Sequence, residues 1–279
     1  MTRAQRRRDR SFPFGLLVAA ILIQAASAPG QTVGLSVLVG PIVDDLGVSR
    51  SAVSTAYLVG TLGGALALRP VGRLLDRIGV RRVAVGVGAL FGLVTASMAG
   101  ATGILALTIG FVGTRALGQG ALTLTATTSV VVGFDRRRGL AIGLTSALGG
   151  ALMSLVPLGV LVLLDQVGLS ATWVVLGATS GALVVGLGLS PLLDQREVSP
   201  IDDVGFDVSP TKHSWEAAAA MRTPAFVVTI AAVSLSALVA TALTFHQIDL
   251  LAERGLSEAQ AAANFLPQTL AGAAAAIGA

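Results

Sequence analysis

Apolar residues fall into eight stretches, each near the ~20 residues that cross about 30 Å of bilayer hydrocarbon. They cover residues 13–41, 51–68, 82–100, 104–132, 139–164, 171–192, 224–247 and 258–279. None of them alternates with the period of two that is expected of a barrel strand, and backbone polar groups in lipid must be satisfied internally. The pattern therefore predicts eight membrane-spanning helices and an all-α membrane protein.

Composition agrees with this pattern and removes other classes of protein. Of the 279 residues 53% are hydrophobic and only 12% are charged, and the mean hydropathy is +0.81. A soluble domain carries about 25% charged residues, so soluble enzymes and nucleic-acid-binding domains are excluded. Neither a phosphate-binding loop nor an HExxH pair is present, and no nucleophile motif surrounds Ser180, which would have to pair with His246 in an intramembrane protease. We expect no enzyme, no cofactor and no metal site.

The positive charges are distributed by membrane side. If the N-terminus is cytoplasmic, all of the 19 Lys and Arg except Arg50, Arg115 and Arg254 lie in cytoplasmic segments. Cytoplasmic loops carry such an excess of cations. We therefore expect a multi-pass protein of the cytoplasmic (inner) membrane with a cytoplasmic N-terminus, and the net charge of +4 requires no nucleic-acid partner.

The same reading divides the chain into four parts: a basic cytoplasmic N-terminus at 1–12, a six-helix bundle at 13–192, an acidic cytoplasmic linker at 193–223 and two further helices at 224–279. An alternative for residues 1–28 is a signal peptide, because a basic start and an apolar run lead to Ala26-Ser27-Ala28. Pro29 directly after that site disfavours cleavage, so we expect an uncleaved first helix.

A short internal repeat supports the division. Leu46-Gly47-Val48-Ser49 precedes the second helix, and Arg254-Gly255-Leu256-Ser257 precedes the eighth, at an offset of 208 residues. Ser257 with Gln260 predicts a capping box, and Ser49 predicts an N-cap. Pairing helix 2 with helix 8 is what a duplication of six helices requires.

The segment GRLLDRIGVRR lies between the second and third predicted helices. It resembles the signature loop of the major facilitator superfamily, although Val80 replaces a common basic residue. The segments 34–57 and 115–143 and the sequence TFHQ at 244–247 are similar to bacterial members of the monocarboxylate-porter group. The positions that match the signature are Gly72, Asp76, Arg77, Gly79 and Arg81.

This resemblance implies a secondary transporter with twelve helices in two halves, which works by alternating access. It implies that the signature loop governs the conformational switch and that helices 1, 4 and 7 line a central cavity. Because the offset of 208 residues places a second signature loop near position 280, we expect a C-terminally truncated fragment. That fragment would hold the complete N-terminal six-helix bundle of the superfamily fold plus helices 7 and 8.

Arg115 is the sharpest candidate for a substrate-binding residue. It lies about 12 residues, or roughly 18 Å, into the fourth predicted helix and so near the bilayer centre. A charge there costs at least ~2.5 kcal/mol and usually faces an aqueous cavity or a partner. Two interpretations follow: the guanidinium binds an anionic substrate group, or it is a structural charge bonded to carbonyls of helix 1 or 5. Gln119, Thr123 and Thr127 follow at four-residue intervals and predict a polar stripe.

Two other helices add polar candidates. Gln24, Ser27 and Gln31 share one face of the first helix, which Pro29-Gly30 interrupts, and interrupted helices often line transport sites. His246 is the only histidine in a predicted span, and it is either a proton-coupling group or an inert polar residue at the outer mouth.

We expect a monomeric, proton-coupled secondary transporter of a small organic anion such as a monocarboxylate. The expected partners are this small-molecule substrate, protons and the lipid bilayer. Similarity to the superfamily leaves a drug or metabolite efflux antiporter as one alternative, although the fifth helix lacks the Gly-Pro motif of drug–proton antiporters and the first helix has no Lys to meet a carboxylate. A non-transporting membrane sensor or scaffold, or an inactive fragment, is the alternative from another class.

Overall fold

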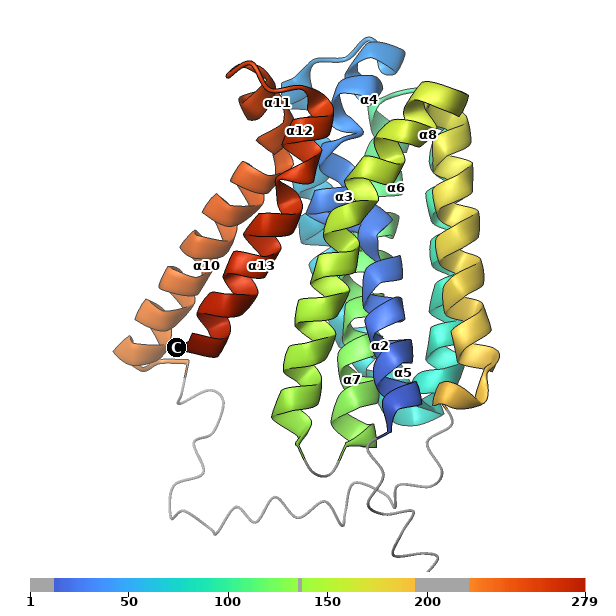
Figure 1. Cartoon of the computed structure of the whole chain (residues 1–279), viewed down its shortest axis with the longest axis vertical. Helices are drawn as coiled ribbons and strands as arrows, with labels where there is room; N and C mark the ends of the chain where they lie inside the picture. The colour runs from blue at the N-terminus through green and yellow to red at the C-terminus, as the bar shows by residue number, and fades with distance from the viewer. Residues whose placement is uncertain (1–12, 135–136, 194–220, 279) are drawn as a thin grey trace, which may run out of the picture.

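A computed structural model describes residues 13–134, 137–193 and 221–278 (Figure 1). The described residues form helices and turns with no strand among them, as expected of an all-α protein. Residues 1–12 and 194–220, which hold the predicted basic N-terminus and most of the predicted linker, lie outside them. By length and composition, four helical segments can cross a membrane, namely Arg50–Gly100, Ile104–Gly133, Arg138–Leu189 and Pro224–Phe245.

The first predicted span is broken at the proline that the sequence singles out. Helix α2 (Phe14–Ala26) is followed by a 3-10 turn, η1 (Ala28–Gly30), and then by α3 (Thr32–Ser36) and α4 (Val39–Leu46). Pro29 has no N–H to donate and its ring crowds the preceding turn. Gln31, extended at φ −98° and ψ 157°, joins η1 to α3. The chain therefore crosses this level of the bundle as short helical pieces instead of one helix.

Two long segments, α5 (Arg50–Ser97) and α8 (Arg138–Leu189), each contain two helical runs joined at one glycine. Gly79 has φ 81° and Gly168 has φ 75°, values that glycine adopts without steric cost. The sequence predicted a loop from residue 72 to residue 82, and the structure corrects this prediction. The segment is helical on both sides of a turn at Gly79, because Arg and Leu are strong helix formers even at an exposed site. The structure thus divides the helical segments differently from the eight helices predicted.

The fourth span is continuous but not uniformly α-helical. After the 3-10 turn η2 (Met98–Gly100), α6 (Ile104–Thr114) leads into η3 (Arg115–Leu122), a π-helical segment, and then into α7 (Thr123–Gly133). Insertions of π-helix are rare and frequently occur at functional sites. The predicted polar residues of this span begin where the π-helical segment begins.

The two runs of α5 and α8 that follow their bends pack closely through small residues. A Cβ atom added to Gly92 would lie 2.8 Å from the carbonyl oxygen of Gly177 and 3.0 Å from the Cα atom of Gly181. Such contacts let helix backbones approach in a membrane protein, where lipid is as apolar as the side chains. A final 3-10 turn, η4 (Pro191–Leu193), buries Leu193 in the core next to α2.

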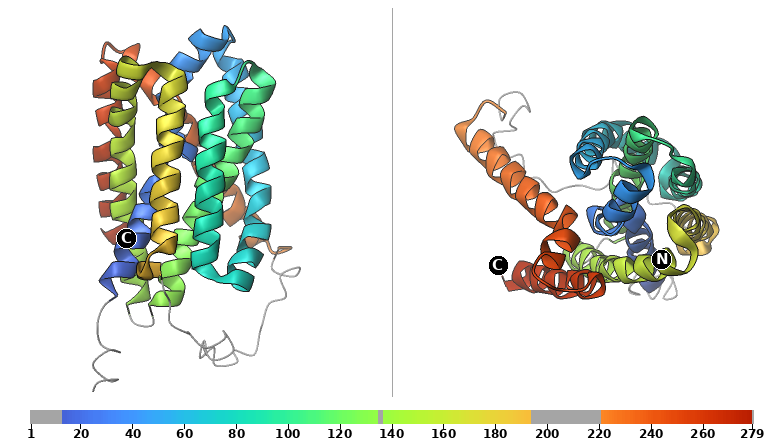
Figure 2. Two further views of the ribbon diagram at one scale, coloured as in Figure 1. Left: turned by 90° about the vertical axis from the view of Figure 1, so that its right-hand side faces the viewer. Right: turned by 90° about the horizontal axis from the view of Figure 1, so that it is seen from above.

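The second part comprises α10 (Pro224–Phe245), α11 (Gln247–Ala252), α12 (Glu258–Ala263) and α13 (Phe265–Gly278). The N-cap predicted at Ser49 and the capping box predicted at Ser257 are both confirmed. Helices α12 and α13 contact α8, and α10 contacts α3. The contact of α10 lies towards the end of the molecule that carries α4, α11 and α12, here called the upper end, and the start of α10 lies away from the bundle, whereas α13 runs beside α8 (Figures 1 and 2). Phe245 is the one buried residue of α10, a helix described over its whole length.

Candidate functional site

The break in the first span presents a backbone carbonyl to the centre of the bundle. Gly30 ends η1 and lies outside the ladders of α2 and α3, so its oxygen can accept a bond from another helix. Arg115, the first residue of η3, binds this oxygen: its Nη1 donates to the Gly30 oxygen at 3.1 Å. The interrupted helix and the π-helical segment are thereby joined at one point.

Arg115 is 2% exposed and its remaining contacts are also neutral groups. Its Nε donates to Thr61 Oγ1 at 3.2 Å, and its Nη1 lies 3.5 Å from Thr32 Oγ1. The guanidinium carbon lies 4.7 Å from the centre of the Tyr57 ring, within the range of a cation–π contact. Of the two interpretations of Arg115, the bond to a carbonyl of the first helix is therefore present in the structure.

Arg115 faces no carboxylate of the described residues. Within the described part of the chain the one ion pair joins Arg50 to Asp249 at the upper end, and no Asp or Glu side chain is buried. A buried cation without a counter-charge is costly. The hydrogen bonds and the aromatic ring offset part of this cost, and the positive charge itself stays uncompensated.

The contact between Arg115 and Gly30 requires two glycines at the crossing. A Cβ atom on Gly30 would lie 2.3 Å from the Thr114 carbonyl oxygen and 2.8 Å from the Cα atom of Gly118. A Cβ atom on Gly118 would in turn lie 2.8 Å from the Cα atom of Gly30. Any larger residue at either position would push the first helix away from the fourth.

A short chain of hydrogen bonds continues from the break towards the lower end. Gln31 Nε2 donates to Ser27 Oγ at 3.0 Å and to Thr123 Oγ1 at 3.1 Å, while Ser27 Oγ donates to the Gln24 carbonyl at 2.7 Å. Three residues that were predicted on the first helix, Gln24, Ser27 and Gln31, are thus brought together with Thr123 of α7.

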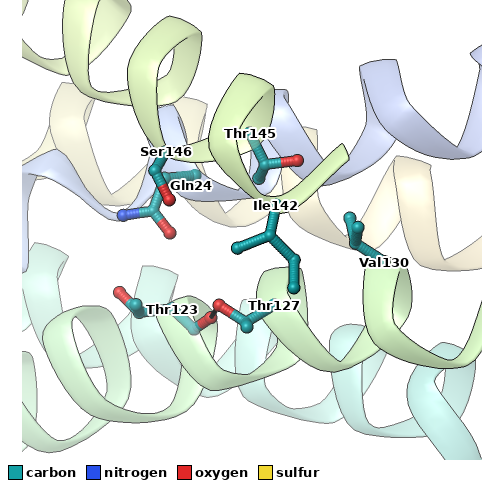
Figure 3. A pocket seen from close by; sticks show the side chains of 7 residues that line it. All are labelled: Gln24, Thr123, Thr127, Val130, Ile142, Thr145 and Ser146. Carbon is teal, nitrogen blue, oxygen red and sulfur yellow. Dashed lines mark hydrogen bonds between the residues drawn. The ribbon is translucent and has the colours of Figure 1, made fainter. Parts of the chain in front are cut away.

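Below this chain lies a pocket of about 130 Å³ between α2, α7 and α8 (Figure 3). Gln24 and Thr123 were predicted as cavity residues, whereas the contributions of α8 were missed. A hydroxyl in an apolar span is the signal that could have indicated them. The lining residues are Gln24, Thr123, Thr127, Val130, Ile142, Thr145 and Ser146. All of them are uncharged, so the pocket offers hydrogen bonds and apolar contact but no formal charge.

Two predicted residues lie elsewhere. Gln119 was placed on one stripe with Arg115 and Thr123, but its side chain is exposed and does not line the pocket. The π-helical segment explains the difference, because i→i+5 bonding puts more residues into each turn and residue i+4 no longer faces the same way. His246 lies between α10 and α11, with its ring edge-on to Phe245 at 5.1 Å between centres.

The signature segment occupies the lower ends of the two runs of α5. Arg81 donates from Nε to the Gly188 carbonyl and from Nη2 to the Leu189 carbonyl, each at 3.2 Å. Arginine commonly satisfies the last carbonyls of a helix in this way, so Arg81 joins α5 to the end of α8. Gly72 is half-buried and approaches Leu124 of α7, while Asp76 and Arg77 are exposed.

Apolar helices of membrane-spanning length, a broken first helix and a polar pocket inside the bundle define a multi-pass membrane protein. Residues 14–279 match the Major Facilitator Superfamily, and the chain belongs to that family. The protein is therefore a membrane transporter. No curated protein matches the chain.

Proposed function

We propose that the protein is a proton-coupled secondary transporter of a small organic anion, of which monocarboxylates are the first class to test. It would act as a monomer in the cytoplasmic membrane with its N-terminus and the signature segment inside, so that the upper end faces outwards. The observation that carries the proposal is the uncompensated charge of Arg115, which is buried in the same helix bundle that encloses the neutral polar pocket but does not line it.

The charge favours an anion over other solutes of the same size. Thr123 lies eight residues after Arg115, or at most about 12 Å along the helix axis, because the π-helical segment between them rises less per residue than an α-helix. At an effective dielectric constant of about 20, a carboxylate at that level gains about 1 kcal/mol from the guanidinium, and more if it moves closer. An organic cation would be repelled by a similar amount, and this supports an anion transporter over efflux of cationic drugs.

The uncharged side chains that line the pocket would recognise the solute through hydrogen bonds. Hydroxyls of Thr127 and Ser146 and the amide of Gln24 can donate to carboxylate oxygens or accept from a hydroxyl of the solute. Because each such bond contributes only about 0.5–1.5 kcal/mol net, selectivity would depend on several of them together. The pocket of about 130 Å³ fits a solute of a few heavy atoms.

Proton coupling is assigned to His246. Its imidazole can carry a proton on a ring nitrogen, and it lies where α10 meets the bundle. Arg115 stays protonated at all physiological pH values, so it can attract the anion but cannot carry the proton.

Uptake of labelled lactate into proteoliposomes, driven by an acidic exterior, tests the proposal. We expect uptake by the wild-type protein, competition by other monocarboxylates and none by lactamide, which is neutral and of nearly the same shape. Arg115→Gln should reduce uptake at least tenfold, Arg115→Lys should retain part of it with a raised KM, and Arg254→Gln is the exposed matched control. Undiminished lactate uptake by a folded Arg115→Gln protein would refute the role of this charge.

A further inference from the structure

Tyr57 of α5 contacts both the buried cation and the second part of the chain. Its ring centre lies 4.7 Å from the Arg115 guanidinium carbon and 4.2 Å from the ring centre of Phe245, with an interplanar angle of 32°. All three side chains are nearly inaccessible, at 6% exposed for Tyr57, 2% for Arg115 and 3% for Phe245. The Tyr57 ring is therefore shielded from water on the side of Arg115 and on the side of Phe245. Cation–π attraction is strongest when the partners are desolvated in this way.

The position of the ring is fixed by its surroundings. The Tyr57 hydroxyl and Thr32 Oγ1 share a hydrogen bond of 2.6 Å, and Phe111 meets the ring edge-on at 6.1 Å between centres. Thr32 also lies within reach of Arg115 Nη1. Any movement of the guanidinium therefore changes the environment of the Tyr57 ring directly.

Phe245 is the point at which α10 is held. It is the one buried residue of that helix, and the lower part of α10 leaves the bundle (Figure 2). The ion pair between Arg50 and Asp249 lies nearer the upper surface and is half exposed on the Arg50 side, so it is screened by water and contributes little. The pair of Tyr57 and Phe245 is thus a buried contact that holds α10 against the bundle at the upper end.

We propose that Tyr57 couples the charge of Arg115 to closure of the upper end, as a positioning residue for the transport proposed above. While Arg115 is unpaired, its charge is attracted to the Tyr57 ring and holds it against Phe245. An anion that pairs with Arg115 withdraws the guanidinium from the ring, weakens the stack and shifts the population towards a state with an open upper end. A neutral solute of the same size makes no such change.

The absence of cysteine from the sequence makes the test direct. Val53 lies one helical turn above Tyr57 and is fully buried, so Val53→Cys reports opening through its rate of labelling by a membrane-impermeant maleimide in proteoliposomes. Ser51→Cys, at an exposed position, normalises the rate. Tyr57→Leu should raise Val53→Cys labelling about three- to tenfold, which corresponds to about 0.7–1.4 kcal/mol, and Tyr57→Phe should restore the low rate because it keeps the ring.

Phe111→Leu is the matched control for lost aromatic packing, because Phe111 is as deeply buried as Tyr57 and contacts it. Equal labelling in Tyr57→Leu and wild type, or an equal rise with Phe111→Leu, would overturn the inference. Arg115→Gln should raise labelling as well, and the double variant Arg115→Gln/Tyr57→Leu should rise no further than either single variant. Fully additive effects would show that Tyr57 acts independently of Arg115 and would also overturn the inference.

Sodium lactate, with lactamide as its neutral control, separates this inference from the proposed function. Lactate should raise Val53→Cys labelling in the wild-type background and leave it unchanged in the Tyr57→Leu background. A response to lactate that persists in Tyr57→Leu overturns the coupling. No response in the wild type, together with the expected non-additivity of the variants, overturns the monocarboxylate assignment and supports the coupling of Arg115 to Tyr57.

Discussion

The crossing of the first and fourth helices at Gly30 gives the most direct test of the site's construction. In Gly30→Ala the new methyl group would meet the Thr114 carbonyl oxygen at 2.3 Å and the Gly118 Cα atom at 2.8 Å, whereas ordinary contacts begin at 3.4 Å. Both are backbone atoms and cannot rotate aside. The two helices must therefore separate by about an ångström, and the bond from Arg115 Nη1 to the Gly30 oxygen, now 3.1 Å, is lost.

Overpacking of this kind costs about 1–3 kcal/mol, and loss of a hydrogen bond from a charged group about 1.5–3 kcal/mol. Because both costs arise at one contact they are not additive, and we expect about 3 kcal/mol in total. For a chain of this size this lowers Tm by roughly 6–12 °C.

Thermal unfolding of the purified protein in detergent, followed by tryptophan fluorescence, measures the change. Gly86→Ala in α5 is the matched control, because a Cβ atom there meets nothing within 4 Å and alanine is the better residue inside a helix by about 0.5–1 kcal/mol. A Gly30→Ala protein that melts within about 2 °C of the wild type, when 1 kcal/mol already shifts Tm by that much, would refute the close crossing.

Three further outcomes are expected. Gln24→Leu removes an amide from the pocket lining and should raise the KM for lactate several-fold, since one hydrogen bond is involved, without lowering Tm; an unchanged KM would remove Gln24 from the site. Ser257→Ala abolishes the capping box of α12 and should cost about 1 kcal/mol, seen as a Tm lower by a few degrees, whereas Ser51→Ala should have no such effect. Arg50→Glu should raise labelling of Val53→Cys less than twofold because the ion pair is largely exposed, and Arg50→Glu/Asp249→Arg should restore the wild-type rate; a larger rise would make this pair, and not Phe245, the main contact of α10.

Local features were predictable where one residue type determines one geometry. Pro29 predicted the break in the first helix, and Ser49 and Ser257 predicted their caps, because each depends on neighbours a few residues away. Glycines four residues apart do not determine one geometry in this way. Those at 88 and 92 pack against another helix, whereas Cβ atoms on Gly139 and Gly143 would meet nothing within 4 Å.

The remaining features depend on three-dimensional geometry that the hydrophobic periodicity of the sequence does not determine. The π-helical segment alters the hydrogen-bond ladder without any change in composition, so the sequence did not show that Gln119 lies outside the pocket that Thr123 lines. The contact between Tyr57 and Phe245 joins residues 188 positions apart, and no spacing rule links them. The segment around Gly79 was interpreted as a loop because it resembles the signature loop, although its arginines favour a helix.

The isolation of α10 has a consequence for how the chain is made. A helix of 22 residues with a mean hydropathy of 2.3 can partition into the bilayer on its own as it leaves the ribosome. Since only Phe245 at its end is buried against other helices, its insertion and its docking are separate events, set by different residues. Biogenesis can therefore place α10 across the membrane before it docks against α3.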